Sequence, residues 1–499
     1  MKFQLVYNIL LIFLSLDIIA GLLWLISRRR GKKVKTRRLF LYAGGLLTVY
    51  LLGGVFIAYL QQPEISQDYV LRWSSADFYG EKAADERVAL VKTNQGALEE
   101  RLRLISLAQE RIILSSFDLR ADNSGCDVIA MLLEAADRGV QIEMMVDGFN
   151  AMLNMDGEKN IQNLAAHENV NIYIYNPVNV LKPWELMGRL HDKYIIVDNS
   201  YLLLGGRNTN DFFLGDYPGC SRYSLDMEVL VYGGGEALRQ VESYFDGIID
   251  LPCTKSFRGE RCRPEVEESL FARAEELRTI YPQCFLPYDY EKNTYSASKI
   301  TLLSNPPHTG AKEPQVLWAM TQLLSEAREQ AVIYTPYLIC NDAMYERISL
   351  VAQNVPDTRM ILNSCETASN IFGAAVYQND KRKIIETGAD TYTYFCQSPA
   401  SSCHMKTALV DTRLSLIGSF NFDMRSAYLN TELMLAVDSP ELAVELEAYL
   451  EEIQASSGRI VDMESMEVPE GLLVPDVPPA QRLSRLFLRI IERPIRFLM

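Results

Sequence analysis

Two long apolar runs open the chain, before any alternation of apolar and polar positions begins. The first covers residues 3–27, with Asp17 as its only charge, and the second covers residues 39–60 without a charged residue. Either run is long enough to cross about 30 Å of hydrocarbon as a helix. The first run ends in three arginines instead of small residues, which disfavours a cleaved signal peptide. The pattern predicts a two-helix transmembrane hairpin within residues 1–64.

The rest of the chain alternates short apolar runs with segments of helical spacing, and it does so twice in the same order. Each half predicts a buried strand, an amphipathic helix and two further strands. The helix of the first half stops at Gly139, a favourable residue just past a helix end. The elements are expected at residues 111–117, 127–138, 140–146 and 171–175, and again at residues 331–337, 343–353, 358–362 and 391–395.

This alternation predicts an α/β protein with two similar lobes, in which helices cover the sheets. Prolines at positions 252, 264, 282 and 287 favour a join between the lobes in that region. The expected order is a hairpin, a first lobe, an inter-lobe linker, a second lobe and a tail, at residues 1–64, 65–250, 251–297, 298–455 and 456–499.

Charge is distributed unevenly along the chain, whose 499 residues carry a formal net charge of −15. Residues 1–60 hold nine Lys or Arg against Asp17 alone, a charge of +8, which leaves −23 for the remainder. Proteins bind nucleic acid largely by neutralising its phosphates, and a body this acidic is unsuited to that. We therefore expect no nucleic-acid partner.

The segment between the two apolar runs, residues 28–38, contains eight basic residues in eleven. The positive-inside rule places such a segment in the cytoplasm, so the body is expected on the outer side of the cell membrane. The nine cysteines leave the side open, because Cys253 and Cys262 could form a disulfide or every thiol could be free in a reducing compartment.

One spaced motif occurs near the end of each half. In both copies a Lys follows the His by two positions, an Asp by seven, a Gly by fourteen and an Asn by seventeen. Because the chain has four histidines and two of them head this motif, a chance repeat is improbable. The first copy contains His191, Lys193, Asp198, Gly205 and Asn208, and the second contains His404, Lys406, Asp411, Gly418 and Asn421.

Strand geometry assigns expected roles within this motif. Side chains two positions apart share a face of a strand, so each His should lie beside its Lys. The Asp stands at an odd offset, faces away on an unbroken strand and is interpreted as architectural. A Gly-Gly or Gly-Ser pair lets backbone or hydroxyl groups approach a ligand, and each Asn can donate to an oxyanion.

Acidic residues stand at matching places farther along each half, before an apolar strand. They are Asp226 or Glu228 in the first half and Glu432 in the second. Such a carboxylate could hold the imidazole of its own half in one tautomer, as the acid of a catalytic triad does. The pattern does not choose between Asp226 and Glu228.

Two imidazoles, two ammonium groups and two amides meeting at one point are typical of phosphodiester chemistry. One His attacks phosphorus and forms a phosphohistidine. The other His gives a proton to the leaving alcohol and later takes one from the incoming alcohol. The Lys and Asn side chains stabilise charge on the non-bridging oxygens. This chemistry needs no metal or cofactor, and the sequence offers no cluster at metal-ligand spacing.

The doubled motif resembles the HxKxxxxD signature of the phospholipase D superfamily, over roughly residues 90–445. Within the superfamily the chain most resembles the bacterial cardiolipin synthases. That resemblance rests on the N-terminal hairpin, on residues 191–208, and on residues 418–426 followed by Asn430-Thr431-Glu432.

The resemblance implies two phospholipase D-like αβαβα lobes with mixed sheets and one active site between them. It implies phospholipid substrates and transfer of a phosphatidyl group from one phosphatidylglycerol to another, with release of glycerol. The first-half His is the nucleophile in relatives, which favours His191. The alternatives are hydrolysis to phosphatidic acid or transfer to another acceptor, as in phosphatidylserine synthesis. A non-catalytic membrane scaffold is disfavoured because both motifs are intact.

Two segments outside the motif are candidates for lipid contact. Residues 480–499 carry five arginines among Leu, Phe and Ile, with Glu492 as the only acid. They predict an interfacial helix on anionic lipid or, alternatively, a tail helix packed on the body. Residues 183–187, just before the first motif, include Trp184 and could dip into lipid or pack within their lobe.

Overall fold

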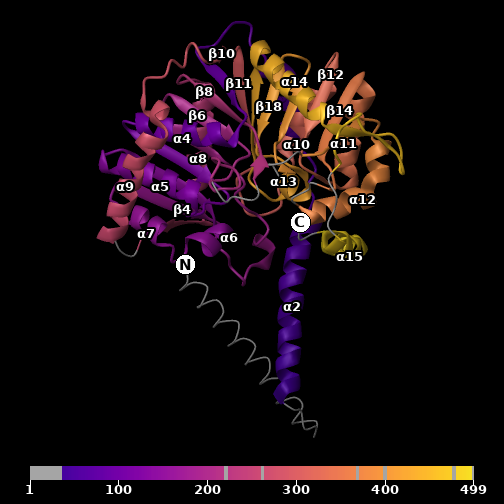
Figure 1. The fold of residues 1–499 in the computed structure, drawn as a ribbon. Helices are drawn as coiled ribbons and strands as arrows, with labels where there is room; N and C mark the ends of the chain where they lie inside the picture. The colour runs from indigo at the N-terminus through magenta and orange to yellow at the C-terminus, as the bar shows by residue number, and fades with distance from the viewer. Residues whose placement is uncertain are drawn as a thin grey trace.

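The computed structural model describes residues 36–217, 223–259, 263–366, 370–396, 402–474 and 479–496. The first predicted membrane run, residues 3–27, lies outside the described residues. Among the described residues one helix is long and apolar enough to cross a membrane, α2 (Thr36–Leu60), over its portion Leu41–Leu60. This helix projects away from the body as a single rod (Figure 1). The second run is therefore a helix, whereas the two-helix hairpin stays a prediction.

The body is built around two mixed β-sheets, one in each lobe. The strands of the first sheet are β1 (Arg87–Val91), β2 (Arg111–Ser116), β3 (Gln141–Asp147), β4 (Val170–Tyr175), β5 (Tyr194–Val197), β6 (Tyr201–Gly205), β8 (Glu228–Tyr232), β9 (Thr254–Phe257) and β10 (Tyr295–Ser296). Those of the second are β11 (Lys299–Ser304), β12 (Gln330–Tyr334), β14 (Asp357–Asn363), β15 (Asp390–Tyr394), β17 (Thr407–Val410), β18 (Leu414–Gly418), β20 (Leu433–Asp438), β21 (Ser457–Ile460) and β22 (Met466–Glu467).

The two sheets repeat one strand order. The first runs β10-β1-β8-β6-β5-β2-β3-β4-β9 and the second runs β11-β20-β18-β17-β12-β14-β15-β21-β22. Strand by strand across the sheet, the run from β1 to β9 in the first matches the run from β11 to β21 in the second. The pairs β2-β3, β3-β4, β12-β14 and β14-β15 are parallel, and the other pairs within these sheets are antiparallel. The predicted α/β class, two lobes and mixed sheets are confirmed.

Helices cover the sheets in both lobes (Figure 1). The first lobe contains α4 (Asn94–Leu107), α5 (Asn123–Asp137), α6 (Gly148–Asn150), α7 (Lys159–Ala166), α8 (Glu236–Ile249) and α9 (Pro264–Ile280). The second contains α10 (Gln315–Ser325), α11 (Asp342–Asn354), α12 (Ile371–Glu386), α13 (Met424–Tyr428), α14 (Pro440–Ala455) and, at the C-terminal end, α15 (Pro479–Ile495). The short helix α3 (Gln67–Arg72) follows α2.

The elements predicted from hydrophobic spacing are confirmed, with small shifts at their ends. The helix expected at residues 127–138 begins earlier, as α5, because the side chain of Asp122 caps it by accepting the N–H of Gly125 at 3.2 Å. It ends before Gly139, whose φ of +97° suits glycine. The strand expected at residues 331–337 ends at Tyr334, ahead of Pro336, which has no N–H for a sheet ladder.

The two lobes share one hydrophobic core, which fixes them against each other. Its buried members include Val88 and Val229 of the first lobe and Leu435 and Val437 of the second. Helix α8 of the first lobe packs on β11 of the second, and α14 of the second packs on β1 of the first. The site between the lobes is therefore held from both sides by apolar packing.

The segment 251–297, treated above as a linker, contributes β9, α9 and β10 to the first lobe. Its chain is ordered by pairing, because β9 adds to the edge strand β4 and α9 packs on α5. Cys253 at its start is a free thiol, and Cys262 lies outside the described residues. Strands β21 and β22, from the predicted tail, extend the second sheet.

Candidate active site

Each His and Lys pair of the motif lies at the start of a central strand. His191 and Lys193 immediately precede β5, and His404 and Lys406 immediately precede β17. Both strands have neighbours on both sides, so the backbone at these positions is fixed. The Lys193 ammonium donates to the carbonyl of His191, and the Lys406 ammonium lies 2.6 Å from Nδ1 of His404. Each Lys lies beside its His, as the spacing predicts.

Asp198 and Asp411 stabilise the turn that follows each of these strands. Both have left-handed backbone conformations, with φ of +48° and +50°. The carboxylate of Asp198 accepts the backbone N–H groups of residues 109–111 at 2.9 to 3.3 Å. Asp411 accepts those of residues 328–330 at 2.8 to 3.2 Å. The geometry agrees with an architectural role, because each Asp fastens the start of the neighbouring strand, β2 or β12.

Short contacts between the lobes position each imidazole. The two-residue strands β7 (Ser224–Leu225) and β16 (Ser402–Cys403) pair in parallel across the interface, and the N–H of His404 donates to the carbonyl of Leu225 at 2.7 Å. On the other side, the N–H of His191 donates to the hydroxyl of Thr431 at 3.0 Å. Each motif histidine is thus hydrogen-bonded through its backbone N–H to the opposite half.

As a consequence, each imidazole contacts the carboxylate of the other lobe. Nδ1 of His191 lies 2.8 Å from Oε1 of Glu432, and Nδ1 of His404 lies 2.9 Å from Oδ2 of Asp226. The prediction that each carboxylate serves the imidazole of its own half is wrong. The inter-lobe pairing exchanges the partners, and Nε2 of each ring remains as the nitrogen for chemistry.

Glu228 does not belong to the site, which corrects the other option left open for the first half. Its side chain is fully buried and accepts two hydrogen bonds from Arg101, at 2.5 and 2.9 Å. Arg207 lies 3.5 Å away on the same carboxylate. Asp226, which precedes β8, reaches His404, whereas Glu228, the first residue of β8, pairs with two arginines.

The glycines of the motif make room for the segments that carry Asp226 and Glu432. The prediction that they make room for a ligand is wrong. A Cβ at Gly206 would lie 2.3 Å from Oδ1 of Asp226. A Cβ at Gly418 would lie 2.1 Å from the carbonyl oxygen of Leu433. Only glycine permits such approaches. The hydroxyl of Ser419 likewise donates to Glu432, at 2.5 Å.

Asn208 and Asn421 lie at equivalent places after the central hairpins and are both buried. Oδ1 of Asn208 accepts the N–H of Asp118 at 3.3 Å, which leaves the amide NH₂ group to donate. Oδ1 of Asn421 has no partner among the described residues. Donation by their NH₂ groups to a phosphate oxygen stays a prediction.

Burial and the two lysines keep both imidazoles neutral. The pKa of His404 is lowered to about 3, mainly by burial and then by Lys406, against the opposing effect of Asp226. The pKa of His191 is lowered well below its usual range by burial, Lys193 and Lys406. Because lysines of both lobes act on both rings, the two half-motifs form one electrostatic unit.

The lysines themselves are held where they titrate near neutral pH. Burial lowers the pKa of Lys193 to about 7, opposed by Glu432, and lowers that of Lys406 to about 8, opposed by Asp226 and Glu432. Two crowded ammonium groups in a buried site favour an anion between them. A phosphate diester is an anion of this kind.

The two carboxylates differ in their ionisation. Burial raises the pKa of Glu432 to about 7, although Lys193 and Ser419 oppose the effect. Burial also acts to raise the pKa of Asp226, but Lys406 and His404 outweigh it and hold this pKa below its ordinary value. His404 therefore faces a fully ionised partner, which stabilises its protonated form when a proton arrives.

Several residues that the motif did not single out complete the site. The ring of Phe117 packs edge-on to His191, with centroids 5.2 Å apart, and Phe213 lies 5.1 Å from His404. Thr431 holds the backbone of His191, as described above, and Ser419 holds Glu432. The aromatic residues carry no periodic signal that separates them from core residues. Thr431 directly precedes Glu432, a predicted site residue, and this position is the one sequence feature that indicates a place for Thr431 in the site.

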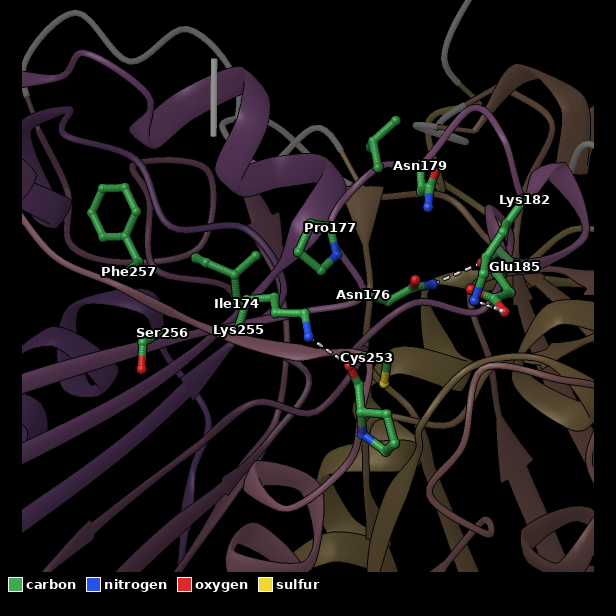
Figure 2. A pocket seen from close by; sticks show the side chains of 12 residues that line it. Ile174, Asn176, Pro177, Asn179, Lys182, Glu185, Cys253, Lys255, Ser256 and Phe257 are labelled. Carbon is green, nitrogen blue, oxygen red and sulfur yellow. Dashed lines mark hydrogen bonds and ion pairs between the residues drawn. The ribbon is translucent and has the colours of Figure 1, made fainter. Parts of the chain in front are cut away.

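A cavity of about 470 Å³ lies beside the loop that leads to His191. Figure 2 shows Asn176, Lys182, Glu185, Cys253 and Lys255 around it. The amide of Asn176 donates to the carbonyls of Glu185 and Gly188 at 2.7 and 2.8 Å and so holds the loop. None of the predicted catalytic side chains lines this cavity.

A family profile described as "Cardiolipin synthase, PLD-like domain" matches residues 102–249 and 320–454, more than half of the chain. The chain belongs to this phospholipase D-like family. The matched stretches contain both His motifs and both carboxylates that contact the imidazoles.

Relatives of this chain cover most of its length. An uncharacterized protein of Helicobacter pylori J99 is 26% identical over 465 residues, covering 83% of this chain and 90% of the relative. Cardiolipin synthase C of Escherichia coli K12 is 24% identical over 390 residues, covering 70% and 80%. Cardiolipin synthase A of Pseudomonas fluorescens Pf-5 is 24% identical over 386 residues, covering 77% and 72%.

The fold is also shared with a solved structure. The phosphatidylserine synthase of Haemophilus influenzae Rd KW20 superposes with a TM-score of 0.61 at 15% identity, covering 84% of this chain and 97% of that one. The two-lobed phospholipase D-like fold implied by the doubled motif is thereby confirmed.

The exchange of carboxylates between the lobes predicts the effect of two matched substitutions. Asp226→Asn removes the charge that stabilises protonated His404, and we expect kcat to fall about 10²- to 10⁴-fold with little change in KM. Glu228→Gln, two residues away and outside the site, should keep kcat per folded molecule. Steady-state kinetics on a lipid phosphodiester measures both. Equal losses of kcat in the two variants would contradict the assignment of Asp226 to His404.

The lowered lysine pKa values predict an alkaline limit on activity. The protonated lysines bind the phosphate, and they lose their protons as pH rises through about 7 to 8. We therefore expect kcat/KM, which reports the free enzyme, to decline from about pH 7 upward instead of near the ordinary lysine pKa. The Lys406→Arg variant keeps the charge at position 406 and should retain only the part of the decline that Lys193 causes. A wild-type kcat/KM that stays level to pH 10 would refute this reading.

Proposed function

We propose that this chain is a membrane phosphatidyltransferase that makes cardiolipin from two phosphatidylglycerol molecules and releases glycerol. One observation carries the proposal: His191 and His404 share a buried site with two lysines, and each ring is held through Nδ1 by a carboxylate of the opposite lobe. Membership of the cardiolipin synthase, PLD-like family and relatives named cardiolipin synthase support the choice of donor and acceptor.

In the first half-reaction the phosphate of the donor lies between Lys193 and Lys406 and accepts from the amides of Asn208 and Asn421. Nε2 of His191 attacks phosphorus, and the bond from phosphorus to the glycerol oxygen breaks as the nitrogen–phosphorus bond forms. His404 gives its proton to the leaving glycerol. The bound phosphate adds negative charge beside His404 and raises its pKa, so that His404 takes up a proton from solvent as the donor binds.

In the second half-reaction a hydroxyl of a second phosphatidylglycerol attacks the phosphohistidine. His404, now neutral, takes the proton of that hydroxyl while the oxygen–phosphorus bond forms and the nitrogen–phosphorus bond breaks. Asp226 stabilises His404 each time it carries the proton. The assignment of His191 as nucleophile is supported by the opposite pKa shifts of Asp226 and Glu432 and by the resemblance to the phospholipase D superfamily. The scheme uses no metal or cofactor.

The acceptor is the point at which alternative functions diverge. Water as acceptor makes the enzyme a phospholipase D that releases phosphatidic acid. Another alcohol makes it a different phosphatidyltransferase, and the Haemophilus neighbour in fold is a phosphatidylserine synthase. The relatives named cardiolipin synthase favour a second phosphatidylglycerol.

Membrane attachment belongs to the same proposal. Helix α2 exposes apolar side chains along its length, including Leu41, Val49 and Ile57 at 66%, 69% and 56% exposure. Such a surface is stable in hydrocarbon and costly in water. We place α2 across the cell membrane, with the body on the outer side as the basic segment before it indicates.

The identity of the lipid product tests the proposed reaction. Detergent-solubilised protein is given phosphatidylglycerol as the sole lipid, and the products are identified by mass. We expect cardiolipin, and we expect none from His191→Ala or His404→Ala protein that retains its fold by circular dichroism. Phosphatidic acid in place of cardiolipin would make the enzyme a hydrolase. Normal turnover by either His variant would refute the two-histidine scheme.

A further inference from the structure

The C-terminal helix α15 is packed on the body through its polar side. Glu492 is fully buried and Arg485 is 5% exposed, although both are charged. Arg496 donates to Asp380 of α12 at 3.0 Å, and the amide of Asn379 on the same helix donates to Glu492 at 3.0 Å. A helix that packs on a protein normally turns its apolar face inward, so this orientation is inverted.

The apolar side of α15 faces outward as a consequence. Leu483, Leu486, Phe487 and Ile490 are 70%, 56%, 60% and 74% exposed. Their spacing of three, four and seven positions places them in one stripe along the helix. Holding four large apolar side chains in water gains nothing for the folded body, so the stripe calls for a partner that is itself apolar.

Helix α15 lies at the end of the body from which α2 projects (Figure 1). Arg496 is close enough to act electrostatically on Tyr59, in the last turn of α2. The C-terminal end of α15 therefore lies near the last turn of α2, where α2 leaves the body. If α2 crosses a bilayer, α15 stands at the boundary between head groups and acyl chains.

The loop before His191 extends farther along α2. The hydroxyl of Tyr50 donates to the carbonyl of Leu181 at 2.6 Å. At Gly54 an added Cβ would lie 2.3 Å from Cγ of Pro183, so glycine permits the loop to touch the helix there. Gly54 precedes Leu60 by six residues, which corresponds to roughly 9 Å of helix at 1.5 Å per residue. The loop thus contacts α2 farther from the body than α15 does.

This loop also carries apolar side chains outward. Trp184 is 46% exposed and Leu181 is 38% exposed. Lys182 forms an ion pair with Glu185 at 3.1 Å, and its long stem allows the ammonium to reach the head groups. The cavity of Figure 2 is lined by residues of this loop on one side and of β4 and β9 on the other, so the loop is not fully packed against its lobe.

Charge favours the same partner. The chain beyond residue 60 carries −23, so an anionic lipid surface repels the body as a whole. Helix α15 is the exception, with four arginines against Glu492, and Arg496 directly follows its last residue. Arg482, Arg489 and Arg493 are exposed beside the apolar stripe. Arginines beside an apolar stripe are typical of helices that lie in the head-group region of anionic bilayers.

We propose that α15 and the loop 181–187 are immersed in the leaflet of the bilayer that α2 crosses, and that they hold the active site against anionic lipid. The proposal rests on the membrane attachment proposed for α2. Because the loop runs directly into His191, phospholipid reaches the site from the leaflet without leaving it for water. A second copy of the chain and residues 1–35 are the other occupants that the experiment must separate from lipid.

Photo-crosslinking of the full chain in vesicles tests the proposal. The photoreactive residue p-benzoylphenylalanine replaces Phe487 in one protein and Trp184 in another, within vesicles of phosphatidylglycerol and phosphatidylethanolamine. The control is the same replacement at Val444, an apolar position with 56% exposure on α14, and that helix lies at the end of the body away from α2 and α15 (Figure 1). Mass analysis of the adducts identifies what each position touches.

We expect phospholipid adducts at positions 487 and 184 at least about tenfold above those at 444. Adducts with a second copy or with residues 1–35, or lipid capture no greater than at 444, would overturn the proposal. Crosslinking needs no turnover, so the product assay on the same vesicles is read separately. Lipid capture without cardiolipin would leave the lipid contact standing and reject the reaction, and cardiolipin without lipid capture would do the reverse.

Discussion

The exchange of carboxylates between the lobes is the interaction on which the rest of the site depends. His191 relies on Glu432 and His404 relies on Asp226, so neither lobe contains a complete catalytic pair. The lobes must therefore stay fixed against each other. The shared hydrophobic core and the reciprocal packing of α8 and α14 meet that requirement. The inter-lobe hydrogen bonds at His404 and His191 then set the register of the contact.

The same arrangement gives two unlike histidines on a repeated scaffold. The strand orders and motif spacings are the same in both halves, yet Asp226 stands in one place and Glu432 in the other, and their ionisation differs. A double displacement needs one imidazole that bonds to phosphorus and one that carries protons. In the proposed mechanism the difference between the carboxylates separates these roles without altering the fold that the halves share.

Much of the fold was predictable because hydrophobic spacing is a local property. The strands at residues 111–117 and 358–362 and the motif around His191 follow from residues close in sequence. The exchanged contacts do not, because they join residues 178 and 241 positions apart and depend on how two lobes dock. The role of Gly206 is not readable from the sequence for the same reason, since the group that occupies the space beside it is the carboxylate of Asp226. The amphipathic pattern of α15 was visible, but its inward polar side depends on Asp380 and Asn379 of α12.

The site of covalent modification during turnover tests the account most directly. Protein turning over phosphatidylglycerol is quenched in alkali, in which phosphohistidine survives, then digested and analysed by mass. The account predicts a phosphatidyl or phosphoryl adduct on the peptide that contains His191, at a reduced level in the Glu432→Gln protein. An adduct on the His404 peptide, or cardiolipin formed with no adduct on either peptide, would contradict it.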